Sequence, residues 1–200
     1  RLLREKCPGS RLVFFTLSRN EEIVKVLSLA DRVHTLEIDS GTGRFFSSLG
    51  AALRAIRAER PDVVLDLEFF TRFSAIVAYL TGAPCRVGFK AWEKWRGDLQ
   101  TIGVPFNRYW HVSRNFLNLA AAMELGTPDR VVLDKPRETE AMTKRMAELL
   151  RAEGLMDGHF TCVNANSGEI ALTRRWPLGS FRELTRRIQS ECPDEKVVLL

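Results

Sequence analysis

The chain has 200 residues, of which 45% are hydrophobic and 28% are charged, and its formal net charge is +5. This composition is that of an ordinary folded protein with one sizeable core or two smaller ones, and disorder is not expected. No apolar run approaches the roughly 18 residues that span a bilayer and no leader opens the chain, so we expect a cytoplasmic protein. The four cysteines are far apart, which argues against a zinc site or a disulfide framework.

Short apolar runs alternate along the chain with longer segments of helical period, which is typical of stacked β-α units around a parallel sheet. Most of the strand candidates are apolar throughout, as strands covered by helices on both faces are. Apolar stripes predict helices near residues 49–56, 112–123, 142–150 and 181–188. The predicted strands are Leu12 to Leu17, Val33 to Ile38, Val63 to Leu67, Arg86 to Phe89, Phe160 to Asn164 and Val197 to Leu200.

Glycine and proline at 126–128 mark a domain boundary. The prediction is a first domain over residues 1–126, a linker over 127–136 and a second domain from 137 to 200. The opening residues 1–6 read as the tail of a helix, and the chain stops within an apolar run at 197–200. Because two strands and two helices are too few to close the second domain, we expect the parent protein to extend beyond both ends.

The loop after Val63 to Leu67 is the first candidate site, because parallel sheets bind ligands at the carboxyl ends of their strands. Glu68 can hold a sugar hydroxyl or act as a base there, and Arg72 can hold an anion. The alternative is that Asp66 and Thr71 cap the helix that follows while Arg72 is solvated.

The second candidate is the segment from Arg86 to Arg114, which carries six cations against two carboxylates and three of the four tryptophans. Such a mixture suits a phosphorylated glycolipid, an anionic membrane surface or a single-stranded nucleic acid. The alternative is a long surface excursion whose rings pack back on the domain. At its end, His111 and Arg114 stand at a predicted helix start, where an anion can bind or where His111 makes only a helix-end hydrogen bond.

The third candidate is the loop from Asn164 to Pro177, which leaves a predicted strand and offers small polar residues, a glycine and two arginines. These are groups that hold a diphosphate. The loop contains neither GxGxxG nor GxxxxGK[ST], so it predicts no dinucleotide-binding or P-loop motif. An ordinary polar strand-to-helix connection is the alternative.

The ordered set of motifs resembles heptosyltransferase-type enzymes of glycosyltransferase family 9, from about Leu12 to Leu200. The resemblance is carried by a strand ending in Asn164, a small-residue stretch, the pair Arg174-Arg175, Trp176-Pro177 and a helix with Phe181 and Leu184. Upstream, it is carried by Arg60-Pro-Asp-Val-Val-Leu-Asp-Leu67, Ser74-Ala-Ile, Gly82-Ala-Pro-Cys-Arg-Val-Gly-Phe89 and His111-Val-Ser-Arg-Asn-Phe-Leu117.

This resemblance implies an α/β fold of GT-B type, in which the first Rossmann-like domain lacks its first strand here and the second is only begun. It implies inverting, metal-independent transfer of a sugar, heptose, from a nucleotide-diphosphate donor such as ADP-heptose to the lipopolysaccharide core or a related glycan. The donor is a substrate, and no cofactor and no nucleic acid are expected. Peripheral contact with the inner membrane fits such an acceptor.

By matching positions, Asn166, Ser167 and Arg174, with its neighbour Arg175, would bind the donor. The family commonly has lysine at the position of Arg174, and arginine keeps the charge while changing the geometry. We assign Glu68, Arg72, His111 and Arg114 to the acceptor side. The family's Gly-Asp loop with the catalytic base would precede Arg1, so we expect this stretch alone to have no transferase activity.

Two other functions remain open from the sequence. The segment 86–114 can form a module that binds nucleic acid or an anionic surface, with binding that weakens steeply as salt is raised. The chain can also belong to a non-catalytic Rossmann-like relative.

Overall fold

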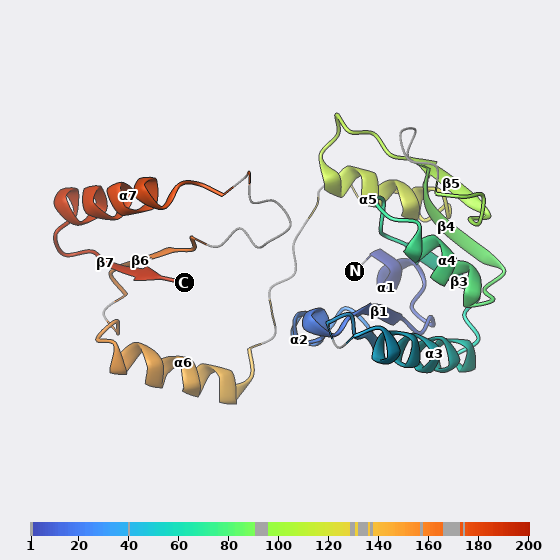
Figure 1. Ribbon diagram of the computed structural model, residues 1–200, viewed down its shortest axis with the longest axis horizontal. Coiled ribbons are helices and arrows are strands. Elements are labelled where there is room, and N and C mark those ends of the chain that lie inside the picture. Colours follow the sequence, from blue (N-terminus) through green and yellow to red (C-terminus); the bar gives the residue numbers. More distant parts are fainter. Residues whose placement is uncertain are drawn as a thin grey trace. The chain divides into compact units, whose positions relative to one another are not determined.

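The computed structural model describes residues 2–39, 41–90, 96–128, 131, 136, 138–156, 158–165, 173 and 175–200. The chain divides into two compact units, Arg1–Arg137 and Glu138–Leu200, which Figure 1 shows in blue to yellow and in orange to red. Within the described ranges no helix has the length and apolar character needed to cross a membrane.

Unit 1 alternates strands and helices in chain order, as the sequence predicts. All its strand pairs are parallel: β1 pairs with β2, and β3, β4 and β5 form a second sheet in that order. Its elements are α1 (Leu2–Lys6), β1 (Val13–Leu17), a 3-10 turn (Ser18–Asn20), α2 (Glu21–Val26), β2 (Arg32–Leu36), α3 (Thr42–Ala58), β3 (Val63–Asp66), α4 (Phe73–Leu80), β4 (Cys85–Lys90), β5 (Ile102–Pro105) and α5 (Val112–Ala121).

The strand pairings are those of the two halves of a doubly wound sheet. In the order 3-2-1-4-5-6, the second and third strands lie on one side of the first, and the next three lie on its other side. The pair β1-β2 and the sheet β3-β4-β5 match these two halves in strand order and in parallel direction. The Rossmann-like parallel arrangement that the sequence predicts is therefore present. The half-buried state of every β1 residue and the 40% exposure of Val63 agree with open strand edges.

The predicted strands match the observed ones to within two residues at each end, but the sequence prediction omits β5. This strand lies inside the segment expected to be one long excursion. Its four residues, Ile-Gly-Val-Pro, include a glycine and a proline, both of which argue against a strand. Proline is tolerated because β5 is an edge strand and Pro105 is its last residue.

The core of unit 1 lies between the three-stranded sheet and α5. Its fully or nearly buried residues are Val87 and Phe89 of β4, Val104 of β5 and Leu119 of α5. Since side chains alternate between the faces of a strand, Val87 and Phe89 define the face that α5 covers. The residue between them, Gly88, belongs to the opposite face.

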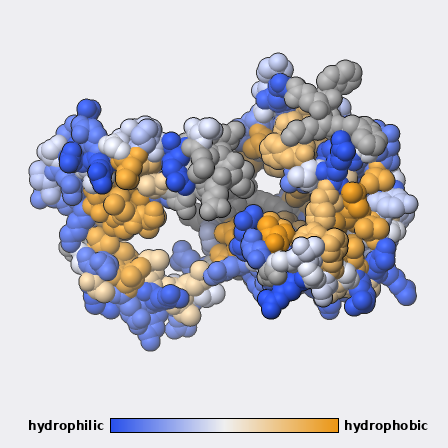
Figure 2. Space-filling model, in the orientation of Figure 1, coloured by the Kyte–Doolittle hydropathy of each residue, from blue (hydrophilic) through white to orange (hydrophobic). Residues whose placement is uncertain are grey.

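Unit 2 contains α6 (Glu140–Ala152), β6 (Phe160–Val163), α7 (Leu178–Glu191) and β7 (Lys196–Leu199), with β6 parallel to β7. The helices lie on opposite sides of this small sheet (Figure 1). Apolar surface shows between them in Figure 2, and the predicted α6 stripe is exposed at Met142, Met146 and Leu149. Two strands therefore give this unit little core, and Val163 is its one buried hydrophobic residue within the described ranges.

Ion pairs and hydrogen bonds connect the amino-terminal part of unit 1 near β2. Arg4 of α1 donates two hydrogen bonds, of 2.9 and 2.7 Å, to the carboxylate of Asp31, which also accepts the Leu12 N–H. The Arg4 guanidinium and this N–H lower the pKa of Asp31. Further along β2, the Nε2 atom of His34 is buried 3.9 Å from Glu59 and makes no hydrogen bond to the described residues. Burial, and then the charge of Arg32, lower the pKa of His34.

His34 should make the folded state sensitive to mild acid. Because its folded-state pKa lies below the ordinary value of about 6.5, the unfolded chain binds more protons as pH falls beneath that value, and stability decreases. His34→Gln should therefore give a urea unfolding midpoint that changes less between about pH 7.5 and about pH 5.5 than that of the unmodified protein. His159→Gln, in unit 2, is the control. An unaltered pH dependence in His34→Gln would contradict the prediction.

Candidate functional site

Two of the predicted site loops begin at the same edge of the three-stranded sheet. Because β3, β4 and β5 are parallel, their carboxyl ends lie together, at Asp66, Lys90 and Pro105. We call this edge, with the loops 67–72 and 106–111 that leave it and the first turn of α5, the carboxyl edge. Glu68 and Arg72 belong to the first loop, and His111 and Arg114 follow the second strand exit.

Aromatic rings join the two loops. The rings of Phe69 and Phe106 are stacked, with centroids 4.2 Å apart and an interplanar angle of 14°. The ring of Phe89 meets both edge-on, at 6.2 and 5.3 Å, and contacts Phe116 of α5 at 5.8 Å. Such pairs are favourable beyond the area they bury. The exits of β3 and β5 are therefore held side by side above the core.

The carboxylate of Glu68 shapes its own loop. Its Oε1 atom accepts the backbone N–H groups of Phe69 at 2.9 Å and Phe70 at 2.6 Å. The Oε2 atom makes no hydrogen bond to the described residues, and the side chain is half-buried. Arg72 is exposed at the residue before α4. The loop therefore offers one carboxylate oxygen, the Oε2 atom of Glu68.

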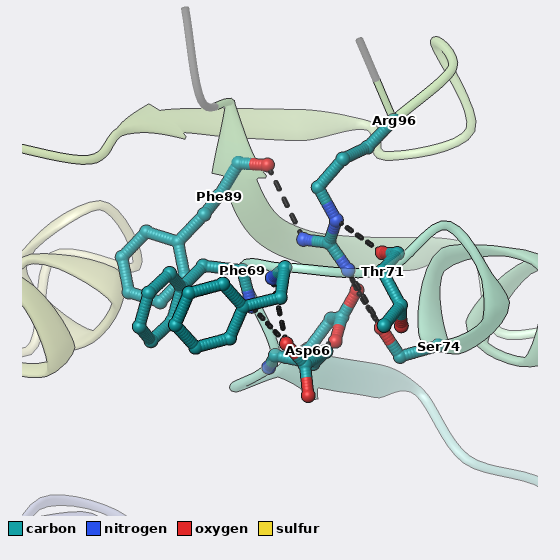
Figure 3. A network of polar contacts seen from close by, with 8 residues as sticks. Asp66, Phe69, Thr71, Ser74, Phe89 and Arg96 are labelled. Atoms are coloured by element: carbon teal, nitrogen blue, oxygen red, sulfur yellow. Dashed lines mark hydrogen bonds and ion pairs between the residues drawn. The ribbon is translucent and has the colours of Figure 1, made fainter. Parts of the chain in front are cut away.

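Beneath this loop, Asp66 and Arg96 form a buried ion pair (Figure 3). Arg96 Nη2 lies 2.9 Å from Asp66 Oδ2, and the two side chains are 2% and 4% exposed. Ser74 Oγ donates to Asp66 at 3.2 Å, and the Glu68 N–H donates to Asp66 Oδ1 at 3.1 Å. Each buried charge is thus paired and hydrogen-bonded, as burial in a medium of low dielectric demands.

The capping interpretation of Asp66 and Thr71 is wrong. The N-cap position of α4 is Arg72, and no side chain caps the helix. Asp66 is instead turned to the buried Arg96, and Thr71 contributes its carbonyl oxygen, which accepts from Arg96 Nε at 2.6 Å. The sequence could not distinguish these roles, because an aspartate before a helix suits either one.

Because Gly88 has no side chain, Asp66 and Gln100 can pack close to the β4 backbone. Asp66 and Gly88 are register partners and project from the same face, the one away from α5. The stretch 96–101 crosses this face where a helix would usually lie, and the Gln100 side chain packs over Gly88. A Cβ atom at Gly88 would come within 2.9 Å of Gln100 Cγ and 3.2 Å of Asp66 Cβ.

At the exit of β5, the buried Asn115 of α5 holds a turn. Its Oδ1 accepts the N–H of Asn107 at 2.8 Å, and its Nδ2 donates to the Asn107 carbonyl at 2.8 Å. The Asn107 side chain accepts the Tyr109 N–H at 2.9 Å. This places the Tyr109 side chain at the surface, 90% exposed, beside Trp110.

His111 is the N-cap of α5. Its Nδ1 atom accepts the Ser113 N–H at 3.3 Å and lies 2.7 Å from Ser113 Oγ. Because Nδ1 is an acceptor, the neutral ring carries its proton on Nε2 and can donate from there. Arg114 lies with its Cζ 4.2 Å from the centroid of the Trp110 ring, a cation–π contact on an exposed surface.

Two of the six cations of the segment 86–114 point into the protein. Arg96 is buried, and Arg86 donates to the carbonyl oxygens of Leu99 at 2.8 Å and Ala83 at 2.5 Å. Of the others, Lys94 lies outside the described residues and Lys90 lies 3.7 Å from Asp98. The segment is thus less of a continuous basic surface than its composition indicates, which weakens the nucleic-acid interpretation.

Most of the predicted donor-binding residues lie outside the described residues. Asn166, Ser167 and Arg174 lie outside the described residues, while Arg175 is described and exposed. The loop does leave the carboxyl end of β6 and return at α7, whose Phe181 packs edge-on against Trp176 at 5.0 Å. Among the residues that the structure describes, no group of three His, Cys, Asp or Glu can hold a metal ion.

Comparisons give the fold its class. No protein-family model matches the chain, and no curated protein matches it. A solved structure of a glycosyl transferase family 9 protein from Veillonella parvula matches with a TM-score of 0.78 and 19% identity, over 99% of this chain and 55% of that one. E. coli heptosyltransferase WaaC, solved with ADP-2-deoxy-2-fluoro heptose, matches with a TM-score of 0.59 and 13% identity, over 98% and 68%.

The parallel sheets and these likenesses define an α/β fold of the GT-B glycosyltransferase type. More narrowly, it is the heptosyltransferase-like fold of glycosyltransferase family 9, as the sequence motifs predict. The chain spans about half the length of the Veillonella structure.

Asn115 should be essential for the turn at the carboxyl edge. Asn115→Ala removes both partners of the Asn107 backbone groups and leaves a cavity, so we expect a loss of unfolding free energy of about 2–4 kcal/mol. Asn118→Ala, on the same helix, is the matched control, because Asn118 makes no side-chain hydrogen bond to the described residues. Urea unfolding measures both variants, and equal losses would contradict the assigned role.

Proposed function

We propose that the whole protein containing this chain is a glycosyltransferase that moves heptose from ADP-heptose to the lipopolysaccharide core or a related glycan. The observation that carries this proposal is the likeness of nearly the entire chain to a family 9 structure. The bound ADP-sugar analogue of the second structure supports the choice of donor. The predicted motifs of the donor loop support it independently of the fold.

The carboxyl edge of unit 1 is proposed as the acceptor side. It carries Glu68, whose Oε2 atom accepts no hydrogen bond from the described residues, the exposed residues Arg72 and Arg114, and the Nε2 donor of His111. A carboxylate orients sugar hydroxyls by accepting hydrogen bonds from them, and guanidinium groups bind acidic sugars and phosphates. This mixture fits an acceptor that is both polyhydroxylated and anionic.

The donor side is proposed at the loop after β6. There Asn166 and Ser167 would bind the donor, and Arg174, with Arg175 beside it, would neutralise the departing diphosphate. A cationic side chain in this role needs no metal ion. The reaction is a direct displacement with inversion: an acceptor hydroxyl loses its proton to a carboxylate base, attacks the anomeric carbon, and expels the nucleoside diphosphate.

The direct test is transfer by the whole protein, with ADP-heptose as donor and heptose-deficient lipopolysaccharide as acceptor. Mass spectrometry should show an acceptor heavier by one heptose, formed in the presence of a metal chelator. No product with this pair, or product that requires a divalent metal, would contradict the proposal.

Arg174→Ala in the whole protein should lower kcat by about a hundredfold, the usual effect of removing one preorganised group that stabilises developing charge. Arg174→Lys keeps the positive charge and should retain most of the turnover. Arg187→Ala is the control, because Arg187 pairs with Glu183 on the exposed surface of α7. If Arg174→Ala turned over ADP-heptose at the unmodified rate, the assignment of Arg174 would be wrong.

We further propose that the protein works in the cytoplasm in peripheral contact with the inner membrane. The support is the exposed pair Tyr109 and Trp110 next to Arg114, because aromatic rings and cations gather at anionic headgroup layers. This surface belongs to the same edge as the proposed acceptor groups, which suits an acceptor anchored in lipid.

Tyr109→Ser should weaken binding of the whole protein to vesicles of phosphatidylglycerol and phosphatidylcholine by several-fold, as measured by flotation. Vesicles of phosphatidylcholine alone should bind weakly in both cases, since they lack the anionic charge. The matched control is Tyr79→Ser, at the chain's other tyrosine, which lies on α4 beside Arg86. Equal binding of the Tyr109 variant and the unmodified protein would remove this surface as the contact.

A further inference from the structure

Arg96 makes hydrogen bonds with every part of its guanidinium group. Its Nε donates to the Thr71 carbonyl at 2.6 Å, and its Nη1 donates to the Phe89 carbonyl at 3.4 Å. Its Nη2 donates to Ser74 Oγ at 2.6 Å and to Asp66 Oδ2 at 2.9 Å. With its side chain 2% exposed, Arg96 is turned inward and is not offered to a ligand.

The partners of Arg96 stand on both sides of Glu68 in the chain. Asp66 precedes the loop and Thr71 lies near its end, and Figure 3 shows both contacting the guanidinium of Arg96. Between them two carboxylates hold the backbone. Asp66 accepts the N–H of Glu68, and Glu68 accepts the N–H groups of Phe69 and Phe70. A single side chain therefore closes the loop that carries Glu68 and Arg72.

Stability alone gives little reason for this ion pair. Replacing a buried ion pair by well-packed apolar side chains is often neutral or stabilising, whereas removing one partner is costly. What the pair provides here is a defined backbone path over residues 67–72. Arginine suits the task because its planar fork reaches a carbonyl, a hydroxyl and a carboxylate at once, which the point charge of lysine does not.

We propose that Arg96 is a positioning residue of the acceptor site, which fixes the β3 exit loop so that Glu68 Oε2 faces the acceptor. This inference rests on the proposed transfer to a glycan acceptor. It assigns to Arg96 an effect on the acceptor side only.

The test compares Arg96→Lys with Arg86→Lys in the whole protein. Lysine at 96 keeps a cation opposite Asp66 but gives up the bond to Thr71. Arg86 is the matched control because it holds the other end of the same crossing stretch, at Leu99, near the start of β4. Hydrogen exchange of the peptide 67–72 reports the loop, and steady-state kinetics with ADP-heptose and deacylated heptose-deficient lipopolysaccharide report the site.

Arg96→Lys should speed exchange at the amides of Phe69 and Phe70 and raise the KM for the acceptor roughly tenfold, the effect of losing one charge-assisted hydrogen bond. The KM for ADP-heptose and kcat at saturating acceptor should stay close to their unmodified values. Arg86→Lys should leave the acceptor KM and the exchange of this peptide unchanged. A merely structural role would instead lower the active fraction, and so kcat, without a selective change in one KM.

Unchanged exchange in Arg96→Lys, or faster exchange with an unchanged acceptor KM, would overturn the proposal. If Arg96→Lys fails to fold, Ser74→Ala supplies the same test, because it removes the hydroxyl that bridges Arg96 and Asp66 and leaves the ion pair. Failure of the proposed function is a different result: the unmodified protein then transfers no heptose at all. In that case the role of Arg96 in acceptor binding is also contradicted, while the hydrogen-exchange data still decide whether Arg96 orders the loop.

Discussion

The ion pair between Asp66 and Arg96 is the interaction on which the carboxyl edge depends. It lies at the end of β3, beneath the loop with Glu68, and it ties that loop to the stretch that leads from β4 to β5. On the opposite face of the sheet, ordinary packing of Phe89 against Phe116 and Leu119 holds α5. One face is thus fastened by hydrophobic burial and the other by a charge pair with a complete set of hydrogen bonds.

Much of this architecture could be predicted from local pattern. Runs such as Val63-Val-Leu and Phe160-Thr-Cys-Val are β-rich and are bounded by turn residues, and they are strands in the structure. The strand β5 could not be predicted, because Gly103 and Pro105 carry the signals of a loop and only pairing with β4 makes the segment extended. Tertiary context overrides local preference at such edges.

The site shows the same division. Glu68, Arg72, His111 and Arg114 could be predicted as candidates, because ligands bind at the carboxyl ends of parallel strands. The roles of Arg96 and Asn115 depend on partners 30 and 8 residues away, and nothing in the local sequence marks either as buried. Six cations in one segment suggested a solvated surface, yet Arg86 and Arg96 satisfy backbone carbonyls inside the protein. Composition measures how much charge a segment has and is silent about where each side chain points.

The two sheets of unit 1 are joined by their helices. Within the described ranges β1 pairs only with β2 and β3 pairs only with β4, so no strand hydrogen bonds join the two sheets. Contacts between α3 and α4 join them instead: Arg57 Nε donates to the Leu80 carbonyl at 2.7 Å, and the rings of Phe45 and Phe73 lie 5.8 Å apart. Cooperativity between parts of a protein comes from the contacts they share. Loss of the α3–α4 contacts would therefore weaken the coupling between the two sheets during unfolding.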